Sequence, residues 1–144
     1  MSYLVDTNVI SELRKGTRAD RRVTDWFAGV AEGDLYLSVL TLGEVRKGIE
    51  RIRRRDQRAA APLERWLREL LEAHRDRILP IDQAVAEEWG RLSVPDPLPV
   101  VDGLLAATAA VHGLVLVTRN VKDLLRSGVS LLNPFESAAT RRPR

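Results

Sequence analysis

Leu114-Val115-Leu116-Val117-Thr118 is an uninterrupted apolar run that ends on a hydroxyl. A short run of this kind is typical of a strand buried on both faces inside a parallel sheet. An alanine-rich helical stretch, 102–112, precedes it and stops at Gly113, and a short helix is predicted after it at 121–125. We therefore predict an α/β domain built around this strand.

Strand-like and helix-like segments also alternate along the rest of the chain. The predicted strands are 3–5, 35–39, 77–81 and an edge strand at 130–132, and the predicted helices are 6–13, 20–32, 41–52, 62–71 and 82–89. The proline-rich stretch 93–99 is interpreted as a loop, because no second core follows it. We expect a three-layer α/β/α domain with a central, mainly parallel sheet over residues 1–136. The basic tail, 137–144, is expected to be mobile.

Composition limits the chemistry that this chain can perform. Its 144 residues suffice for one domain, and 44% hydrophobic with 30% charged residues is typical of a globular protein. The lack of cysteine excludes disulfides, thiolate metal sites and cysteine nucleophiles, and the only histidines, His74 and His112, lie far apart in sequence. We find no signal peptide and no apolar run long enough to span a membrane, so we expect a cytoplasmic protein. Carboxylates are expected to carry most of any catalysis.

Positive charge is concentrated in three segments, although the net charge is only +3. Residues 14–22 carry a net +4, residues 46–58 a net +5 and the tail +3, so the rest of the chain carries −9. Of the 23 basic residues, 20 are arginine, whose planar guanidinium binds phosphate through two hydrogen bonds. This separation favours an anion-binding face and a separate acidic site. The alternative is that the arginines only cover solvated helix faces.

Four carboxylates lie beside apolar segments and are the candidate site residues. Asp6 directly follows the first strand, and Asp123 follows the strand at 114–118. Glu44 and Asp102 lie near the start of predicted helices. Because α/β sheets gather their sites at the carboxyl ends of the strands, we expect these acids to meet at one edge. Such a group would repel itself without a cation, and oxygen ligands suit Mg²⁺ or Mn²⁺.

Each acid also has a simpler explanation when it is considered alone. Asp6 and Asp102 could cap the helices that follow them. Glu44 could complete a capping box with Thr41, in the pattern T-x-x-E. Asp123 could be a solvated surface charge. Only the combination of the four favours a functional site.

Four ordered motifs resemble those of the PIN-domain ribonucleases. They are Leu-Val-Asp6-Thr7-Asn8, Leu-Gly-Glu44-Val, Asp102-Gly-Leu-Leu-Ala-Ala-Thr and Leu-Val-Thr118-Arg119-Asn120-Val-Lys-Asp123, with Asn133-Pro134-Phe135 after the last predicted strand. The similarity spans nearly the whole chain and is strongest to VapC toxins of toxin–antitoxin pairs, including the FitB-like branch. It implies a parallel-sheet α/β/α fold and an endoribonuclease that depends on Mg²⁺ or Mn²⁺ and leaves a 5′-phosphate. It also implies a homodimer, a cognate antitoxin and higher toxin–antitoxin assemblies.

The resemblance assigns roles to particular acids. Asp6, Glu44 and Asp102 match the family's three principal acids, so they are the expected catalytic and metal-binding residues. The family's fourth acidic position falls on Asn120 in this chain. Asp123, three residues later, is the expected catalytic substitute.

The expected substrate-binding residues are three polar residues near the acids and three consecutive arginines: Thr7, Thr118, Asn120, Arg53, Arg54 and Arg55. The polar residues would orient the acids or a water, as the resemblance implies. The arginines would hold the RNA backbone with an affinity that falls as salt rises. No aromatic residue lies in 46–58, so recognition of the shape of a tRNA or another structured RNA is favoured over base stacking.

Two further questions stay open at the level of sequence. Amphipathic helices could form a groove for an antitoxin helix or simply pack in the core; the residues concerned are Ile49, Ile52, Leu63, Trp66, Leu67 and Leu70. By resemblance, an antitoxin arginine would enter the acidic site. The rival functions are a catalytically silent module of the same fold that binds nucleic acid or protein, and a metal-dependent nuclease that acts on DNA.

Overall fold

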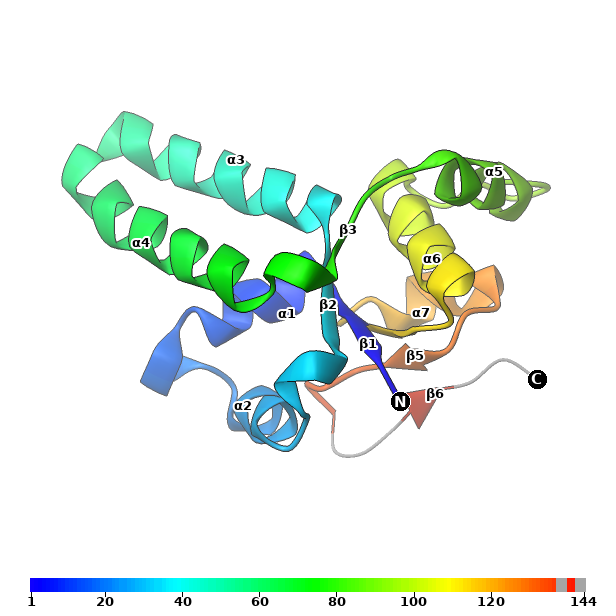
Figure 1. Ribbon diagram of the computed structural model, residues 1–144, viewed down its shortest axis with the longest axis horizontal. Helices are drawn as coiled ribbons and strands as arrows, with labels where there is room; N and C mark the ends of the chain where they lie inside the picture. Colours follow the sequence, from blue (N-terminus) through cyan, green and yellow to red (C-terminus); the bar gives the residue numbers. More distant parts are fainter. Residues whose placement is uncertain (137–139, 142–144) are drawn as a thin grey trace.

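A mainly parallel sheet forms the centre of the protein. The computed structural model describes residues 1–136 and 140–141 and contains a six-stranded sheet of order β3-β2-β1-β4-β5-β6 (Figure 1). The strands are β1 Tyr3–Val5, β2 Leu35–Ser38, β3 Ile78–Leu79, β4 Val115–Val117, β5 Leu131–Leu132 and β6 Thr140–Arg141. Strands β1 to β5 are parallel to their neighbours, and β6 is antiparallel to β5.

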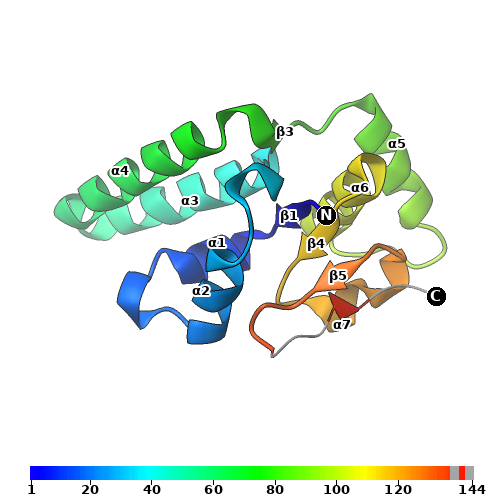
Figure 2. The same ribbon diagram turned by 60° about the horizontal axis from the view of Figure 1, so that its bottom comes forward.

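Helices follow the strands and cover both faces of the sheet (Figures 1 and 2). The α-helices are α1 Thr7–Leu13, α2 Arg21–Ala28, α3 Val39–Arg55, α4 Gln57–Ala73, α5 Gln83–Leu92, α6 Val100–His112 and α7 Val121–Leu124. Short 3-10 turns lie at Gly16–Arg18, Glu32–Asp34, Arg75–Arg77 and Leu125–Ser127. Gly113 has a φ of 65°, a left-handed conformation that ends α6 as the sequence predicts.

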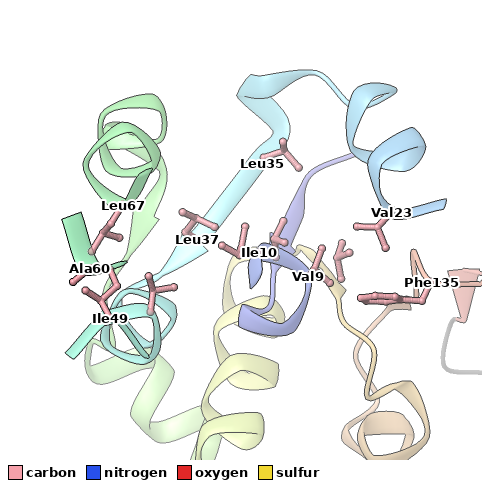
Figure 3. Close-up of a cluster of buried hydrophobic side chains, with 12 residues drawn as sticks. Val9, Ile10, Val23, Leu35, Leu37, Ile49, Ala60, Leu67 and Phe135 are labelled. Atoms are coloured by element: carbon pink, nitrogen blue, oxygen red, sulfur yellow. The ribbon is translucent and has the colours of Figure 1, made fainter. Parts of the chain in front are cut away.

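The alternation of side chains along the strands divides the core into two clusters. Val5, Leu37 and Val117 belong to the cluster under α1 to α4, which is drawn in Figure 3. Leu4 and Leu116 belong to the cluster under α6 and α7 on the other face. All three residues of β4 are buried, as its uninterrupted apolar sequence predicts. The predicted three-layer α/β/α architecture is therefore confirmed.

The start of α3 differs from the prediction. Ser38, the last residue of β2, caps the helix, and its hydroxyl accepts the N–H of Leu40 at 3.0 Å. Thr41 is consequently inside the first turn, so the predicted capping box between Thr41 and Glu44 is wrong. The strand continues directly into the helix, and the apolar residues at the junction, Val39 and Leu40, give no signal of the boundary in the sequence.

Three other helix boundaries also differ. Asp56 caps α4, so Pro62 lies within that helix rather than at its start. Pro99 precedes α6, which places Asp102 in the first turn and not at the cap. Gly29 follows the last residue of α2, so the helix predicted at 20–32 is shorter. Of these three ends, only the start of α4 has a side-chain cap, because Asp56 accepts the N–H groups of Arg58 and Ala59.

The end of the chain adds a strand that the sequence did not predict. β6 pairs with β5 on its outer side, with Leu131 opposite Arg141, so the segment 130–132 is not the edge of the sheet. The remainder of the tail predicted to be mobile, 137–139 and 142–144, lies outside the described residues. Over the described parts of the chain, no helix is long and apolar enough to cross a membrane.

Backbone pairing continues one residue beyond β1 and β4. The N–H of Asp6 donates to the carbonyl of Val117 at 2.9 Å, and the N–H of Thr118 donates to the carbonyl of Leu132 at 2.9 Å. Asp6 and Thr118 therefore lie side by side at the carboxyl edge of the sheet, where open α/β sheets bind their ligands.

Candidate active site

Asp6 caps α1 and is also held from the neighbouring strand. Its Oδ1 accepts the N–H of Thr7 at 2.6 Å, which confirms the capping explanation. Its Oδ2 accepts the hydroxyl of Thr118 at 2.8 Å and lies 3.4 Å from the amide nitrogen of Asn8. The Thr118 bond joins residues 112 positions apart in a place where Asp6 is only 5% exposed. Capping alone does not require this second restraint.

Among the residues that the structure describes, none forms an ion pair with Asp6. Burial raises the pKa of Asp6 to about 6, and the charges of Asp102 and Glu44 raise it further. Hydrogen bonds from Thr118 and Thr7 oppose the increase only in part. Within 1–136 and 140–141, no ion pair involves Asp6 or either of the two neighbouring acids. This edge therefore concentrates negative charge that the described residues do not neutralise.

Glu44 reaches the site from the second turn of α3 through Thr7. The hydroxyl of Thr7 donates to Glu44 Oε1 at 2.6 Å. Thr7 thereby joins two acids, because its backbone N–H bonds to Asp6 and its side chain to Glu44. Glu44 is exposed, so its carboxylate remains accessible to water.

Asp102 approaches the same edge from the first turn of α6. Burial raises the pKa of this half-buried carboxyl, and the charges of Asp123 and Glu44 raise it further. The next residue, Gly103, packs closely on α5, since a Cβ added there would lie 3.1 Å from two atoms of the Trp89 indole. This close approach fixes α6 against α5 and thereby positions Asp102.

The loop from β4 to α7 supplies the remaining predicted residues. Thr118 Oγ1 accepts the N–H of Asn120 at 3.0 Å while its hydroxyl bonds to Asp6. Asn120 is exposed, and its side chain does not cap α7. Asp123 is exposed on α7 and close enough to Asp102 to raise its pKa. The structure thus brings the four predicted acids, Thr7 and Thr118 to one edge, with Asn120 beside them.

Asn8 belongs to the site, although the sequence analysis gave it no role. Its Nδ2 lies 3.4 Å from both Asp6 Oδ2 and Thr118 Oγ1. Its Oδ1 accepts the N–H of Arg119 at 3.3 Å. Asn8 therefore ties α1 to the loop after β4. Its place in the Asp-Thr-Asn motif was the only signal in the sequence.

The oxygen donors at this edge suit a hard cation that keeps part of its water. Mg²⁺ and Mn²⁺ prefer carboxylate oxygens. In the part of the chain that the structure describes, however, no group of three or more acids or histidines could hold an ion by itself. Mg²⁺ usually retains several waters and binds one or two carboxylates. Asp6, which is buried and has no counter-charge, fits such a ligand.

The three arginines predicted to bind RNA lie away from the acids. They occupy the last turn of α3, about ten residues beyond Glu44 and roughly 15 Å along the helix (Figure 1). Arg53 contacts Glu50 at 3.2 Å and also pairs with Glu64 of α4. Arg46 pairs with the same two acids. The charge of Arg53 therefore joins α3 to α4, and this arginine is not free for a phosphate.

Other cations of α3 are accessible. Arg54 and Arg55 are exposed and have no ion-pair partner in the described ranges. Lys47, Arg51 and Arg54 line an open groove of about 510 Å³. These three recur at spacings of four and three residues, so they share one face of the helix. A basic surface is therefore present on α3. Of the three arginines predicted to bind RNA, Arg54 and Arg55 are available in it and Arg53 is not.

An apolar cavity of about 80 Å³ lies between α1, α3 and α4, with Glu44 in its wall. Four of the six residues predicted to form a groove line it: Ile49, Ile52, Leu63 and Trp66. Leu67 is buried in the core, and Leu70 packs against the same core. Ile49 is also buried in this core, and Leu63 and Trp66 also pack against it. The core explanation therefore holds for five of the six residues, and the antitoxin groove stays a prediction.

The fold and the acidic edge together define a class of protein. The chain matches the PIN domain over residues 3–126. In that matched region, Asp6 follows β1, Glu44 lies on the helix after β2, and Asp102 lies on the helix before β4. The chain therefore belongs to the PIN-domain family.

Similar proteins cover nearly the same length. The chain is 33% identical over 140 residues to the VapC ribonuclease Y4jK of Sinorhizobium fredii, a match of 94% of this chain and 99% of that protein. It is 31% identical over 137 residues to the toxin FitB of Neisseria gonorrhoeae, a match of 92% of this chain and 97% of FitB. The crystal structure of FitAcB from Neisseria gonorrhoeae is similar with a TM-score of 0.84 at 30% identity, over 92% of this chain and 98% of that chain.

Proposed function

We propose that this chain is an endoribonuclease that depends on a divalent cation, and that it is the toxin of a toxin–antitoxin pair. The observation that carries the proposal is Asp6, a buried carboxylate with a pKa of about 6, acidic neighbours and no counter-charge among the described residues. A cation relieves this repulsion, and strongly perturbed acids mark functional sites. The similarity to proteins named as a VapC ribonuclease and a FitB toxin supports the same function.

The residues of the edge divide the work of phosphodiester hydrolysis. A bound Mg²⁺ or Mn²⁺ ion would lower the pKa of a water and offset the charge that grows on the phosphate. Asp6 and Asp102 would hold the ion, with Glu44 bound directly or through a water. Thr118 orients the Asp6 carboxylate through its 2.8 Å bond, and Thr7 orients Glu44 through its 2.6 Å bond.

Glu44 and Asp123 are the acids best placed to handle the attacking water. Both are exposed, so each can accept a hydrogen bond from a water that approaches the edge. Asn120 stands beside them and would contact the RNA or the water through its amide. Attack on the phosphorus with departure of the 3′ oxygen leaves a 5′-phosphate on one product and a 3′-hydroxyl on the other.

The basic surface of α3 would hold the backbone of a structured RNA such as a tRNA. Lys47, Arg51, Arg54 and Arg55 are the cations available for this contact. Arg53 would support it only indirectly, by fixing α3 to α4. Phosphate contacts of this kind are independent of sequence and weaken as salt rises.

A side chain of an antitoxin segment would enter the small cavity between α1, α3 and α4. Ile52 and Trp66 offer apolar contacts there, and Arg14 and Glu44 place one charge of each sign in its wall. The test is co-purification with the product of a neighbouring reading frame that encodes a small DNA-binding protein. Ile52→Arg is expected to abolish the complex, whereas Arg75→Gln, in the turn before β3 and outside the cavity lining, is expected to retain it. Light scattering would test the proposed homodimer and larger toxin–antitoxin assemblies.

The central experiment is cleavage of a pool of tRNA and other structured RNA. Wild type and Asp6→Asn are compared in Mg²⁺, Mn²⁺ and EDTA, with Asp25→Asn as a control whose side chain is 71% exposed on α2. We expect cutting that requires a cation, vanishes in Asp6→Asn and persists in Asp25→Asn. Cutting that persists in EDTA or in Asp6→Asn would contradict the proposal. Faster cutting of single-stranded DNA than of RNA would instead indicate a DNA-directed nuclease.

A further inference from the structure

A second hollow lies along the same edge of the sheet, one strand beyond the acids. Arg119 and Lys122 follow β4, Asn133 and Glu136 follow β5, and these residues line a cavity of about 310 Å³. Adjacent strands lie about 4.8 Å apart, so a cavity between the ends of β4 and β5 is roughly 7 Å from β1. It therefore adjoins the site around Asp6.

Arg119 is held in this cavity by its backbone and by its side chain. Its N–H donates to Asn8 Oδ1 at 3.3 Å. Its guanidinium lies over the ring of Phe135, with Cζ 4.4 Å from the ring centroid. A guanidinium stacked on an aromatic face keeps its N–H groups free at the edge of its plane. The side chain is thus oriented before any ligand binds.

The platform under Arg119 is itself fixed by the core. Phe135 is only 5% exposed and belongs to the same hydrophobic cluster as Val9 and Val23 (Figure 3). The buried side chain of Asn133 accepts the N–H of Phe135 at 2.9 Å. The Asn133-Pro134-Phe135 motif, which the catalytic proposal leaves without a role, therefore contributes Asn133 to the wall of the cavity and Phe135 to the support of Arg119.

The cations of this cavity are available to a ligand. Neither Arg119 nor Lys122 has an ion-pair partner among the residues that the structure describes. Glu136 also lines the cavity and places one negative charge beside the two cations, without an ion pair to either in the described residues. The arginines of α3 that pair with acids of α3 and α4 have no such freedom.

We propose that Arg119 and Lys122 form a subsite for a backbone phosphate of the RNA, next to the phosphate that is cleaved. Arg119 would bind two phosphate oxygens through its guanidinium edge, and Lys122 would add a second positive charge. Arg119 is then a positioning residue that sets which phosphate lies over Asp6. The proposal rests on the proposed function in taking RNA as the ligand and Asp6 as the place of cleavage.

Equilibrium binding in EDTA tests the subsite without any need for cleavage. Fluorescence anisotropy of a fluorescein-labelled, mixed-sequence RNA is followed over a salt series for wild type, Arg119→Gln, Lys122→Gln and the double variant. Arg75→Gln is the matched control, because it removes the same charge from the turn before β3, at the opposite edge of the sheet. Melting temperatures verify that each variant is folded.

We expect each single variant to bind RNA about tenfold more weakly, as for the loss of a charged hydrogen bond. The slope of log K against log salt is expected to fall by about 0.7 for each lost phosphate contact. Arg75→Gln is expected to change neither quantity. Equal effects in the double variant and in Arg75→Gln, or no RNA binding by wild type, would overturn the subsite.

The stacked geometry makes a further prediction that simple charge attraction does not. Arg119→Lys keeps the charge but loses the flat fork, so it is expected to restore the salt slope and not the full affinity. Full restoration of affinity by lysine would overturn the role of the Phe135 platform. Intact RNA binding with no cleavage in any cation would contradict the proposed function and leave the subsite standing. Normal cation-dependent cleavage with unchanged RNA binding in the double variant would contradict the subsite and leave the proposed function standing.

Discussion

The acidic edge of the sheet and the far end of the α3–α4 pair differ in whether their charged side chains are paired. At the edge, Asp6 is buried, lies near other acids and has no counter-charge in the described structure. On α3, Arg53 is partly exposed and shares Glu50 and Glu64 with Arg46. At the buried edge, a charge that has lost its hydration is left unpaired, which costs free energy. On the exposed helices, charges that water already stabilises are paired.

This difference indicates which region depends on a ligand. The network on α3 and α4 is complete without any other molecule, so its ion pairs serve the fold. Under the proposed function, a cation bound at the acidic edge offsets the charge of Asp6. The following predictions address that contrast, beginning with the largest expected effect.

Removal of a second acid from the edge is expected to abolish cleavage. Asp102→Asn removes a proposed cation ligand, so we expect the cleavage rate to fall by more than about a hundredfold. Substitution of a residue that only supports a ligand usually costs less than this. Asp123→Asn is expected to cost about tenfold, because that residue would orient a water. Cleavage rates at saturating Mg²⁺ measure both effects. Asp76→Asn, an exposed acid before β3, is the control, and an unchanged rate in Asp123→Asn would make Asp123 an ordinary surface charge.

The buried acid also predicts an unusual dependence of stability on pH. Burial and like charge raise the pKa of Asp6 from 3.8 to about 6 in the folded chain. Between those values the folded state binds more protons than the unfolded state, so stability falls as pH rises from about 4 to about 6. The full effect is roughly 3 kcal/mol. Urea unfolding over this range is expected to show a much larger decline in wild type than in Asp6→Asn, where the raised pKa of Asp102 leaves a smaller one.

A bound cation should reverse this decline. Mg²⁺ at pH 7 is expected to increase the free energy of unfolding of wild type more than that of Asp6→Asn, since only wild type has the full charge to neutralise. Parallel pH profiles of the two proteins, or an equal response to Mg²⁺, would show that Asp6 is not the source of the instability.

The packing that positions Asp102 predicts an intermediate effect. Gly103→Ala places a Cβ 3.1 Å from the Trp89 indole, so we expect a loss of about 1–3 kcal/mol in stability together with slower cleavage. Gly90→Ala on α5 is the matched control, because no atom outside the helix lies within 4 Å of the added Cβ. It should be neutral or stabilising. Equal stability of the two variants would contradict the packing argument.

The smallest effects separate two neighbouring arginines. Arg53→Gln breaks the pairs with Glu50 and Glu64, so we expect a melting temperature a few degrees lower at most and little change in RNA affinity. Arg54→Gln is expected to leave the melting temperature unchanged and to weaken RNA binding with a shallower salt slope. The reverse pattern would mean that Arg53 leaves its partners to bind RNA.

Some features of the fold are already present in local sequence. The apolar run ending at Thr118 predicts a strand buried on both faces, and Tyr3 to Val5 predicts its parallel neighbour. Parallel strands place their carboxyl ends together, so Asp6 and Thr118 could be expected at one edge. Helix starts were less predictable, because Ser38 and Asp56 compete with Thr41 and Pro62 as boundaries and tertiary packing selects between them.

By itself, the sequence determined the class of domain, the edge that carries the acids and the oxygen-rich chemistry of that edge. These follow from periodicity and from the order of strands and helices, which are local properties of the chain. Only the tertiary structure decided that Arg53 is occupied by Glu64, that Asn8 joins Asp6 to the loop of Arg119, and that Arg119 lies on Phe135. Each of these contacts joins segments that meet only after the chain has folded, and no pattern within either segment specifies the partner.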